Sequence, residues 1–291
     1  MAHKSGWSVF TDVICTIARQ FKVADEPNIE QSKDNTPCDN TKTECTMEDT
    51  TDHKTPQVTP APPEKELYQN YLGKEYVNPA DEVYLLWVIG RGSKAETRIG
   101  WDRRQHSFCA VKIMYKSRLV LKQYPREKVI NELSALTILP VHDNICAFRR
   151  AFESEDSIYF ILDMKGFRNY TYLIVNKLTN EDIVQRITRQ IVSATLALHR
   201  AGIYHQDLAS GNIVVRAGWR VGIVDYGAAR LDNIPSVDTG KNGATLRCYE
   251  KIIGGECKPS DVDLWTIGIV AYFAVYGSYP FSGDLVKELQ S

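Results

Sequence analysis

The sequence lacks any apolar run long enough to cross a membrane, and Asp12 interrupts the apolar stretch near its N-terminus. A membrane-spanning helix needs about 20 predominantly apolar residues, and a signal peptide needs a continuous apolar core. The seven cysteines are scattered, odd in number and include no C-x-x-C pair, which does not suit a disulfide framework. These absences predict a chain without a transmembrane segment in a reducing intracellular compartment, cytoplasmic or nuclear.

The sequence also lacks an excess of charge of either sign, since 35 basic and 36 acidic residues give a formal net charge of -1. A surface that binds nucleic acid or a membrane usually shows as a basic excess. Neither is therefore expected as the main partner, and recognition has to come from a local site. The length of 291 residues, with 43% hydrophobic content, suits one two-lobed domain, or two small ones, with a tail.

The first 65 residues differ in composition from the rest of the chain. Apolar residues at intervals of three and four over residues 1–22 predict an amphipathic helix. Its apolar face is expected to pack on the chain's own surface or to dock to a partner or membrane interface. Residues 23–65 are rich in Thr, Asp, Glu, Asn, Lys and Pro and almost free of aromatics. A disordered linker is predicted there, because such a segment buries too little apolar surface to offset its ordering entropy.

Strand-like patterns begin near residue 83. Val83–Ile89 and Phe108–Met114 are apolar and β-prone, and glycines break the chain after the first of them. Ser157–Met164 has the same character. These three segments predict a small twisted sheet.

Helix-like patterns occur between and after these strands. Arg126–Leu139 has apolar residues at helical spacing. Thr179 with Asp182 resembles a capping box before a long amphipathic pattern that reaches Leu198. The second half of the chain is therefore predicted to be mainly helical.

Two carboxylates and one amide stand at a spacing that suits a site for metal-bound phosphates. Tyr204–Asn212 contains Asp207 and Asn212, and Asp225 begins the triplet Asp-Tyr-Gly after one short apolar run. Phosphoryl transfer needs a carboxylate that faces the attacking hydroxyl and oxygen ligands for Mg²⁺. Asp207, Asn212 and Asp225 can supply these groups.

These two segments resemble the catalytic loop and the metal-binding loop of eukaryotic protein kinases. Five further motifs of that family occur in its order. They are Ile89-Gly90-Arg91-Gly92-Ser93, Ala110-Val111-Lys112-Ile113, Asn131-Glu132-Leu133, Asp263-Leu264-Trp265-Thr266-Ile267-Gly268 and Gly277-Ser278-Tyr279-Pro280-Phe281. The resemblance covers residues 84–291 and implies a two-lobed α+β fold. Its N-lobe and hinge, residues 84–164, would hold an antiparallel sheet and one helix. Its C-lobe, residues 165–291, would be mainly helical and lack most of the final helices.

The resemblance also implies roles for single residues. Asp207 is expected to be the catalytic base, Lys112 to contact the α and β phosphates while held by Glu132, and Asn212 with Asp225 to bind Mg²⁺. The expected ATP site adds the glycine-rich loop, one strand alanine and the hinge. Its residues are Ile89, Gly90, Arg91, Gly92, Ser93, Lys94, Ala95, Glu96, Thr97, Ala110, Lys112, Asp163 and Met164.

Some positions depart from the family pattern. Gln206 replaces an arginine that reads an activation-segment phosphate in many members, and Ala209 replaces the lysine typical of serine/threonine kinases. Gly211 stands where tyrosine kinases keep an arginine. One cation for the transition state is therefore missing in both schemes, and such a loss lowers turnover by about 10²-fold.

Three functions stay open from the sequence alone. The first is an ATP- and Mg²⁺-dependent protein kinase, favoured by Lys112, Asp207 and Asp225 and placed in the serine/threonine class by resemblance. The second is a catalytically weak pseudokinase that serves as an interaction module, favoured by Gln206 and Ala209. The third is a small-molecule kinase of related fold.

Overall fold

A computed structural model of the chain describes residues 70–232 and 257–280. The helix expected at residues 1–22 and the linker expected at 23–65 lie outside the described residues. Within the described ranges, no helix is both long and apolar enough to cross a bilayer.

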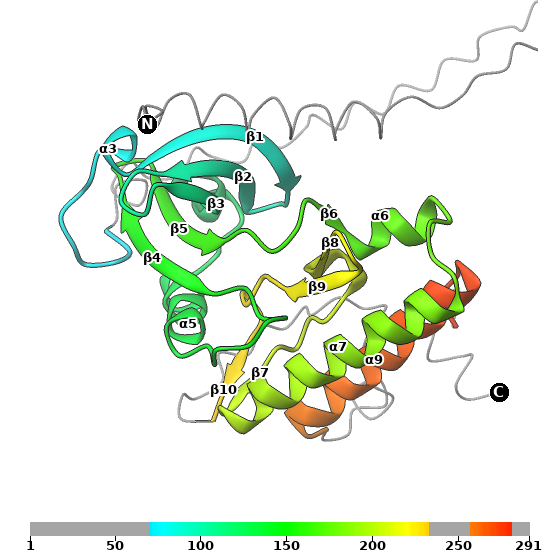
Figure 1. Cartoon of the computed structure of the whole chain (residues 1–291). Helices are drawn as coiled ribbons and strands as arrows, with labels where there is room; N and C mark the ends of the chain where they lie inside the picture. Colours follow the sequence, from blue (N-terminus) through cyan, green and yellow to red (C-terminus); the bar gives the residue numbers. More distant parts are fainter. Residues whose placement is uncertain (1–69, 233–256, 281–291) are drawn as a thin grey trace, which may run out of the picture. The chain divides into compact units, whose positions relative to one another are not determined.

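The first half of the described chain is built on an antiparallel sheet of five strands in the order β1-β2-β3-β5-β4 (Figure 1). The strands are β1 (Val83–Arg91), β2 (Ala95–Asp102), β3 (Ser107–Tyr115), β4 (Phe148–Glu153) and β5 (Ser157–Asp163), and the short helix α3 (Pro79–Glu82) precedes them. β5 is buried along nearly all of its length because apolar clusters cover both of its faces, with Ile158 and Phe160 in the larger cluster and Tyr159 and Ile161 in the smaller. Burial of both faces explains its continuous apolar run.

The alternation of side chains along β3 decides where its lysine points. Cys109, Val111 and Ile113 belong to one apolar cluster, whereas Met114 belongs to a larger one. Successive side chains of a strand lie on opposite faces, so Lys112 shares the face of Met114. The ammonium group is therefore directed toward the side of the sheet on which the larger core lies.

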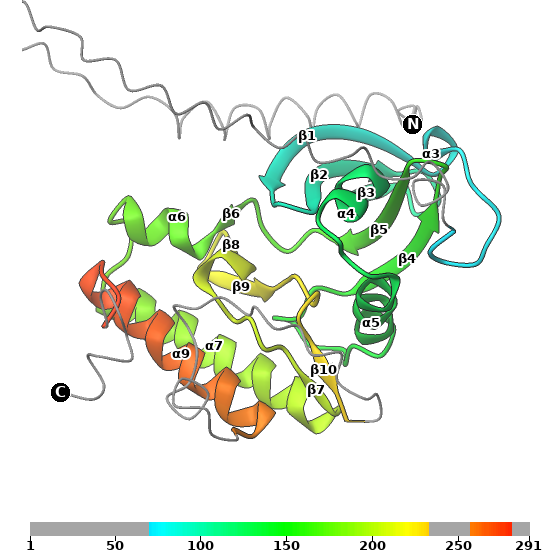
Figure 2. The ribbon, with the colours of Figure 1, turned by 180° about the vertical axis from the view of Figure 1, so that it is seen from behind.

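Two helices connect β3 to β4, namely α4 (Lys116–Leu121) and α5 (Arg126–Thr137). α5 lies beside β4 (Figure 2) and buries Val129, Glu132 and Leu136, which share one helical face. The glutamate is the exception on this apolar face. Because a buried charge is costly without a partner, Glu132 has to meet a cation.

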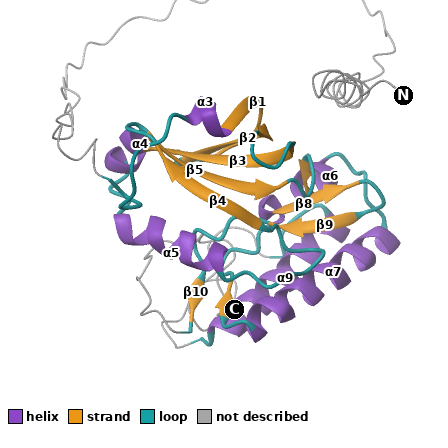
Figure 3. Cartoon of the chain, turned by 60° about the vertical axis from the view of Figure 1, so that its left-hand side comes forward, coloured by secondary structure: helices purple, strands orange, loops and turns teal. Residues whose placement is uncertain are grey.

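The second half contains the long helices α7 (Glu181–Arg200) and α9 (Pro259–Tyr276), which pack side by side (Figure 3). The remaining elements are β6 (Arg168–Asn169), α6 (Tyr170–Val175), β7 (Ile203–Tyr204), the 3-10 turn η1 (Ser210–Asn212), β8 (Ile213–Arg216), β9 (Arg220–Ile223) and β10 (Arg230–Leu231). This architecture confirms the two-lobed α+β fold that the resemblance implies, with an antiparallel sheet in the N-lobe. α5 is the one long helix of the described N-lobe, and α3 and α4 are short additions.

The start of α7 corrects one expectation. The sequence predicts a capping box formed by Thr179 and Asp182, but the cap residue is Asn180. The side chain of Asn180 accepts a hydrogen bond from the backbone N–H of Ile183 at 3.0 Å. This bond satisfies one of the free donors at the helix start, so the capping role belongs to the residue after Thr179.

Apolar residues of both lobes share one core. Met114 and Phe160 of the sheet belong to the same cluster as Ile187 of α7 and Phe273 of α9. The backbone joins the lobes as well, since the N–H of Cys146 donates to the carbonyl of Ile223 in β9 at 3.1 Å. This joint brings the residues that follow β9 close to the sheet.

Candidate active site

Lys112 forms the centre of an ion-pair group built from three elements. Its ammonium nitrogen lies 2.5 Å from Oε1 of Glu132 on α5 and 2.7 Å from Oδ1 of Asp225, which follows β9. Glu132, the charged residue on the apolar face of α5, thus pairs with the Lys112 ammonium group. The sequence predicted the pairing of Lys112 with Glu132 by resemblance, and the structure brings both residues together with Asp225.

The charges of this group depend on one another. The Lys112 ammonium lowers the pKa of Asp225 to about 2. Burial alone would lower the pKa of Lys112, but the carboxylates of Asp225 and Glu132 raise it above its ordinary value. Lys112 and Asp225 are consequently both charged near neutral pH. The negatively charged Asp225 carboxylate thus stays next to the Lys112 ammonium group.

Asp225 is held in an unusual backbone conformation. Its φ of 66° lies in the left-handed region, where aspartate is among the few non-glycine residues that are tolerated. Its Oδ1 also accepts a hydrogen bond from the N–H of Gly227 at 3.3 Å. A Cβ atom at Gly227 would lie 3.2 Å from Oε2 of Glu132 and 3.3 Å from Oδ1 of Asp225. A larger residue here would thus displace one of the two carboxylates by a few tenths of an ångström.

Asp207 and Asn212 lie at the two ends of one short loop. The side-chain amide of Asn212 donates to the backbone carbonyl of Asp207 at 2.8 Å and to its carboxylate Oδ2 at 3.0 Å. The N–H of Val224 donates to the carbonyl of Asn212 at 3.0 Å, which places this loop next to Asp225. The amide of Asn212 thus orients the carboxylate that is expected to act as the base.

Asp263 of α9, which is fully buried, anchors the segment directly before Asp207. Its carboxylate accepts hydrogen bonds from the backbone N–H groups of His205 at 2.9 Å and Gln206 at 2.7 Å, and it lies 2.8 Å from Nε2 of His199. Asp263 was predicted from the sequence only as part of a motif, without this anchoring role. The available signal was a carboxylate inside an apolar helix, which demands partners.

A cavity of about 520 Å³ joins these parts. Of the predicted site residues, its walls include Gly92, Ser93, Lys94, Ala95, Lys112, Glu132, Asp207 and Asp225. Other wall residues were not predicted from the sequence, namely Met114, Lys122, Gln123, Tyr124, Lys128, Gly227 and Ala228. Lys122, Tyr124 and Lys128 are basic or aromatic residues of the α4–α5 segment, where the sequence contains no motif that predicts a binding site.

Other predicted site residues lie outside the walls of this cavity. They are Ile89, Gly90, Arg91, Glu96, Thr97, Ala110, Asp163, Met164 and Asn212. Arg91 and Glu96 form an ion pair across the β1–β2 hairpin, with 3.2 Å between Nε and Oε2. Gly90 pairs with Thr97 in the same hairpin, and Ala110 pairs with Leu162 in β5. Their contact with a nucleotide stays a prediction.

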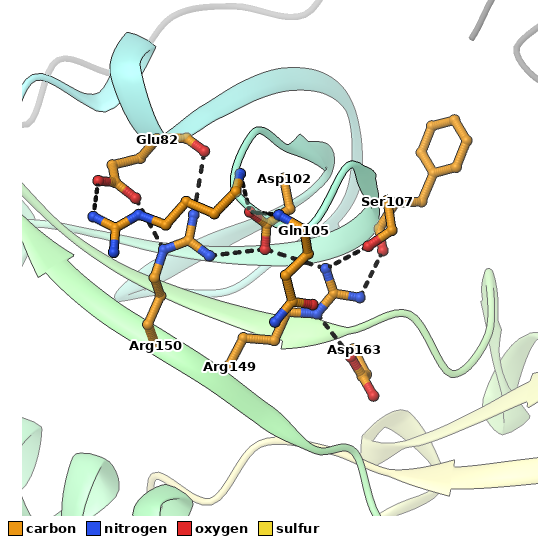
Figure 4. Close-up of polar contacts among 9 residues, drawn as sticks. Glu82, Asp102, Gln105, Ser107, Arg149, Arg150 and Asp163 are labelled. Carbon is orange, nitrogen blue, oxygen red and sulfur yellow. Dashed lines mark hydrogen bonds and ion pairs between the residues drawn. The ribbon is translucent and has the colours of Figure 1, made fainter. Parts of the chain in front are cut away.

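Asp163, expected in the hinge, is held by an ionic network at the end of the sheet (Figure 4). Arg149 on β4 lies 2.7 Å from Oδ1 of Asp163 and 3.2 Å from Oδ2 of Asp102. Arg150 contacts the same Asp102 oxygen at 2.8 Å and Glu82 at 2.9 Å. The backbone N–H of Asp163 donates to the carbonyl of Ala147 at 2.8 Å. The side chain of Asp163 thus joins the end of β5 to β4, and its contact with a nucleotide stays a prediction.

The donor set suits a magnesium ion that is bound together with phosphates. Among the described residues, no three His, Cys, Asp or Glu side chains gather closely enough to hold a metal by themselves. Mg²⁺ usually takes only one or two carboxylates and completes its shell with phosphate oxygens and water. The Asp225 carboxylate and the Asn212 amide oxygen, on neighbouring segments, are hard oxygen donors of this kind.

Comparison with known proteins gives consistent matches over most of the chain. The family described as "Protein kinase domain" matches residues 85–291. The mouse "Serine/threonine-protein kinase PLK2" is 29% identical over 240 residues, which cover 80% of this chain and 35% of that protein. The Dictyostelium discoideum "Probable serine/threonine-protein kinase fhkC" is 25% identical over 230 residues, with 77% and 38% covered. The mouse "Sperm motility kinase 3A" is 27% identical over 207 residues, with 70% and 40% covered. The match thus spans well under half the length of each relative.

Proposed function

Because the chain belongs to the protein kinase domain family, we propose that it is a Mg²⁺-dependent kinase that phosphorylates serine or threonine hydroxyls of protein substrates with ATP. The observation that carries this proposal is the group formed by Lys112, Glu132 and Asp225 in a cavity that Asp207 also lines. A lysine held by two carboxylates, with a further carboxylate in the same cavity that accepts from Asn212, suits phosphate binding next to a base.

The contacts of the polar residues support the following roles. Lys112 has a raised pKa and stays charged, so its ammonium group can bind the α and β phosphates. Asp207, oriented by Asn212, would align the substrate hydroxyl and accept its proton during transfer. Asn212 and Asp225 would hold Mg²⁺, which when bound neutralises charge on the phosphates.

The turn between β1 and β2 would cover the phosphates. The N–H of Gly92 donates to the carbonyl of Ala95 at 2.8 Å, which closes the turn. Ser93 and Lys94 at its tip line the cavity. Backbone N–H groups in such a turn are suited to phosphate oxygens.

A catalytically weak pseudokinase is the second candidate, and one observation favours it. Asp207–Asn212 contains no lysine or arginine, so the loop itself brings no cation to the transferring group. Such a protein would bind nucleotide and partner proteins without measurable transfer.

Transfer of labelled γ-phosphate from Mg-ATP to a set of generic protein substrates separates the two candidates. The wild type should label serine and threonine, while Asp207→Asn should keep nucleotide affinity and lose transfer, because the carboxylate acts on the hydroxyl and not on ATP. A wild type that binds ATP but labels no more than Asp207→Asn would favour the pseudokinase. Labelling of tyrosine alone would contradict the serine/threonine assignment.

A further inference from the structure

The proposed transfer reaction needs a cation that the loop around the base does not contain. Charge spreads over the oxygens of the phosphoryl group during transfer, and fixed cations stabilise it. Asp207–Asn212 has neither lysine nor arginine. Lys112 is already within 2.7 Å of both Glu132 and Asp225, so its charge is shared with two carboxylates.

Three further lysines line the same cavity, namely Lys94, Lys122 and Lys128. None of them forms an ion pair with a carboxylate in the part of the chain that the structure describes. The ammonium group of Lys94 instead lies 4.1 Å from the centre of the Tyr124 ring, and that of Lys128 lies 5.6 Å from the same centre. The cavity therefore has an excess of positive charge at this end.

Lys94 differs from the other two in its place in the fold. It lies at the tip of the β1–β2 turn, one residue before Ala95, which pairs with Met114, while Thr97 pairs with Lys112. Lys94 is thus about 10 Å along the sheet from the position of Lys112, at 3.3 Å per residue. Its long flexible stem can reach toward the phosphates that Lys112 is expected to bind.

The electrostatic surroundings of Lys94 suit the binding of an anionic ligand. Desolvation, followed by the charge of Lys128, lowers the pKa of Lys94, and Asp225 acts in the opposite direction. The ammonium group of Lys94 thus interacts electrostatically with Lys128 and with Asp225, the proposed metal ligand. A cation–π contact with a partly exposed tyrosine is weak compared with a charge-assisted bond to phosphate, so the Tyr124 ring would hold the lysine only loosely.

We propose that Lys94 is a further catalytic residue, whose ammonium group leaves the Tyr124 ring and binds the transferring γ-phosphoryl group. It supplies the cation that the loop around Asp207 lacks. In the transfer, the bond from the γ-phosphorus to the β,γ-bridging oxygen breaks and the bond to the substrate oxygen forms. The hydroxyl proton passes to Asp207, and Lys94 stays protonated throughout. This inference rests on the proposed kinase function and assigns it one more residue.

The first test compares ATP with ADP and does not depend on turnover. Lys94→Ala should weaken ATP binding about tenfold and leave ADP binding unchanged, because only ATP has the γ-phosphate that forms the charge-assisted bond. Lys74→Ala, which removes an exposed lysine that does not line the cavity, is the matched control and should change neither affinity. An equal effect of Lys94→Ala on both nucleotides, or no effect, would overturn the proposed contact. An effect of the same size in Lys122→Ala would overturn the specific role of Lys94.

The second test moves the cation. Lys94→Ala should lower kcat by about 10²-fold, and adding Ala209→Lys to that variant should restore at least about tenfold of the loss, since the new ammonium group would enter the site from the loop. If the double variant is no faster than Lys94→Ala, the proposal that Lys94 supplies the cation missing from the loop around Asp207 is wrong. A wild type that binds ATP without any transfer would defeat the proposed function, and the comparison of ATP with ADP would then still decide whether Lys94 contacts the γ-phosphate.

Discussion

At the scale of single residues, the site depends on charges that hold one another in place. Only 13% of the Lys112 side chain is exposed, and the two carboxylates that contact it, Glu132 and Asp225, come from different segments. The lysine is costly to bury without them. The same group links α5 to the segment after β9 and, in the proposed function, would hold Lys112 in place for phosphates.

We expect Asp225→Ala to abolish the part of the thermal stabilisation by ATP that depends on Mg²⁺. The change removes the proposed metal ligand and one of the two carboxylates on Lys112, but leaves the Lys112–Glu132 pair. The measurement is the Tm with ATP, with and without Mg²⁺. Asp143→Ala removes an exposed carboxylate and serves as the control with an unchanged shift. A full Mg²⁺-dependent shift in Asp225→Ala would exclude Asp225 from the metal site.

At the scale of elements, two buried networks hold the segments that carry these residues. Asp263 fixes the segment before Asp207 to α9 through the backbone of His205 and Gln206. The Asp102 network in Figure 4 joins β4 to the ends of β2 and β5. Both networks satisfy buried polar groups that would otherwise destabilise the fold.

We expect Asp263→Ala to lower the free energy of unfolding by about 3 kcal/mol, because two buried backbone N–H groups lose their acceptor at about 1–3 kcal/mol each. The measurement is denaturant unfolding, with transfer activity as the second readout. Asp261→Ala, in the first turn of the same helix, is the control and should cost less than about 1 kcal/mol. Similar losses in both variants would show that Asp263 does not anchor the loop.

Acid should weaken the Asp102 network in a defined pH range. Burial alone would raise the pKa of Asp102, but hydrogen bonds led by that from Arg150 lower it from 3.8 to about 2. A depressed pKa contributes stability that is complete above the ordinary value and is lost as the pH falls through the folded one. We therefore expect Asp102 to contribute about 2 kcal/mol at neutral pH, and to lose this contribution between pH 4 and pH 2.

The difference in stability between the wild type and Asp102→Asn, followed by denaturant unfolding against pH, isolates this contribution. The difference should be largest above pH 4 and should shrink toward pH 2. Asp143→Asn provides the control for an exposed carboxylate. A constant difference over the whole range would contradict the assignment of the titration to Asp102.

At the scale of the whole molecule, the question is whether phosphorylation controls the proposed activity. The side-chain amide of Gln206 donates to the carbonyl of Pro259 at the start of α9, at 2.7 Å. It is a neutral link between two segments. An arginine there would be a positive charge that a phosphate could neutralise.

We expect the transfer rate to be independent of phosphorylation in the segment between β10 and α9. Ser236 and Thr239 of that segment lie outside the described residues, so this prediction rests on Gln206 alone. The rate should be unchanged after phosphatase treatment and in the Ser236→Ala and Thr239→Ala variants. A large fall on dephosphorylation, reproduced by either variant, would show that another cation reads the phosphate.

The sequence by itself determined the elements and the residues that repeat a local pattern. β5 follows from a continuous apolar run and α5 from apolar periodicity, while Lys112 and Asp225 follow from short motifs within single segments. A local period or motif can show these because the residues concerned are neighbours along the chain. Even so, the pattern did not separate Thr179 from Asn180 as the cap of α7, since both are polar and only the backbone conformation decides.

The tertiary structure alone decided which distant side chains meet. Asp263 binds the N–H of Gln206 across 57 residues, and Lys94 lies over Tyr124 from another segment. No local pattern encodes such contacts, because they depend on how α9 and the β1–β2 turn pack against other elements. The anchor of the segment before Asp207 and the lysine proposed for the transferring phosphate were therefore visible only once the chain was folded.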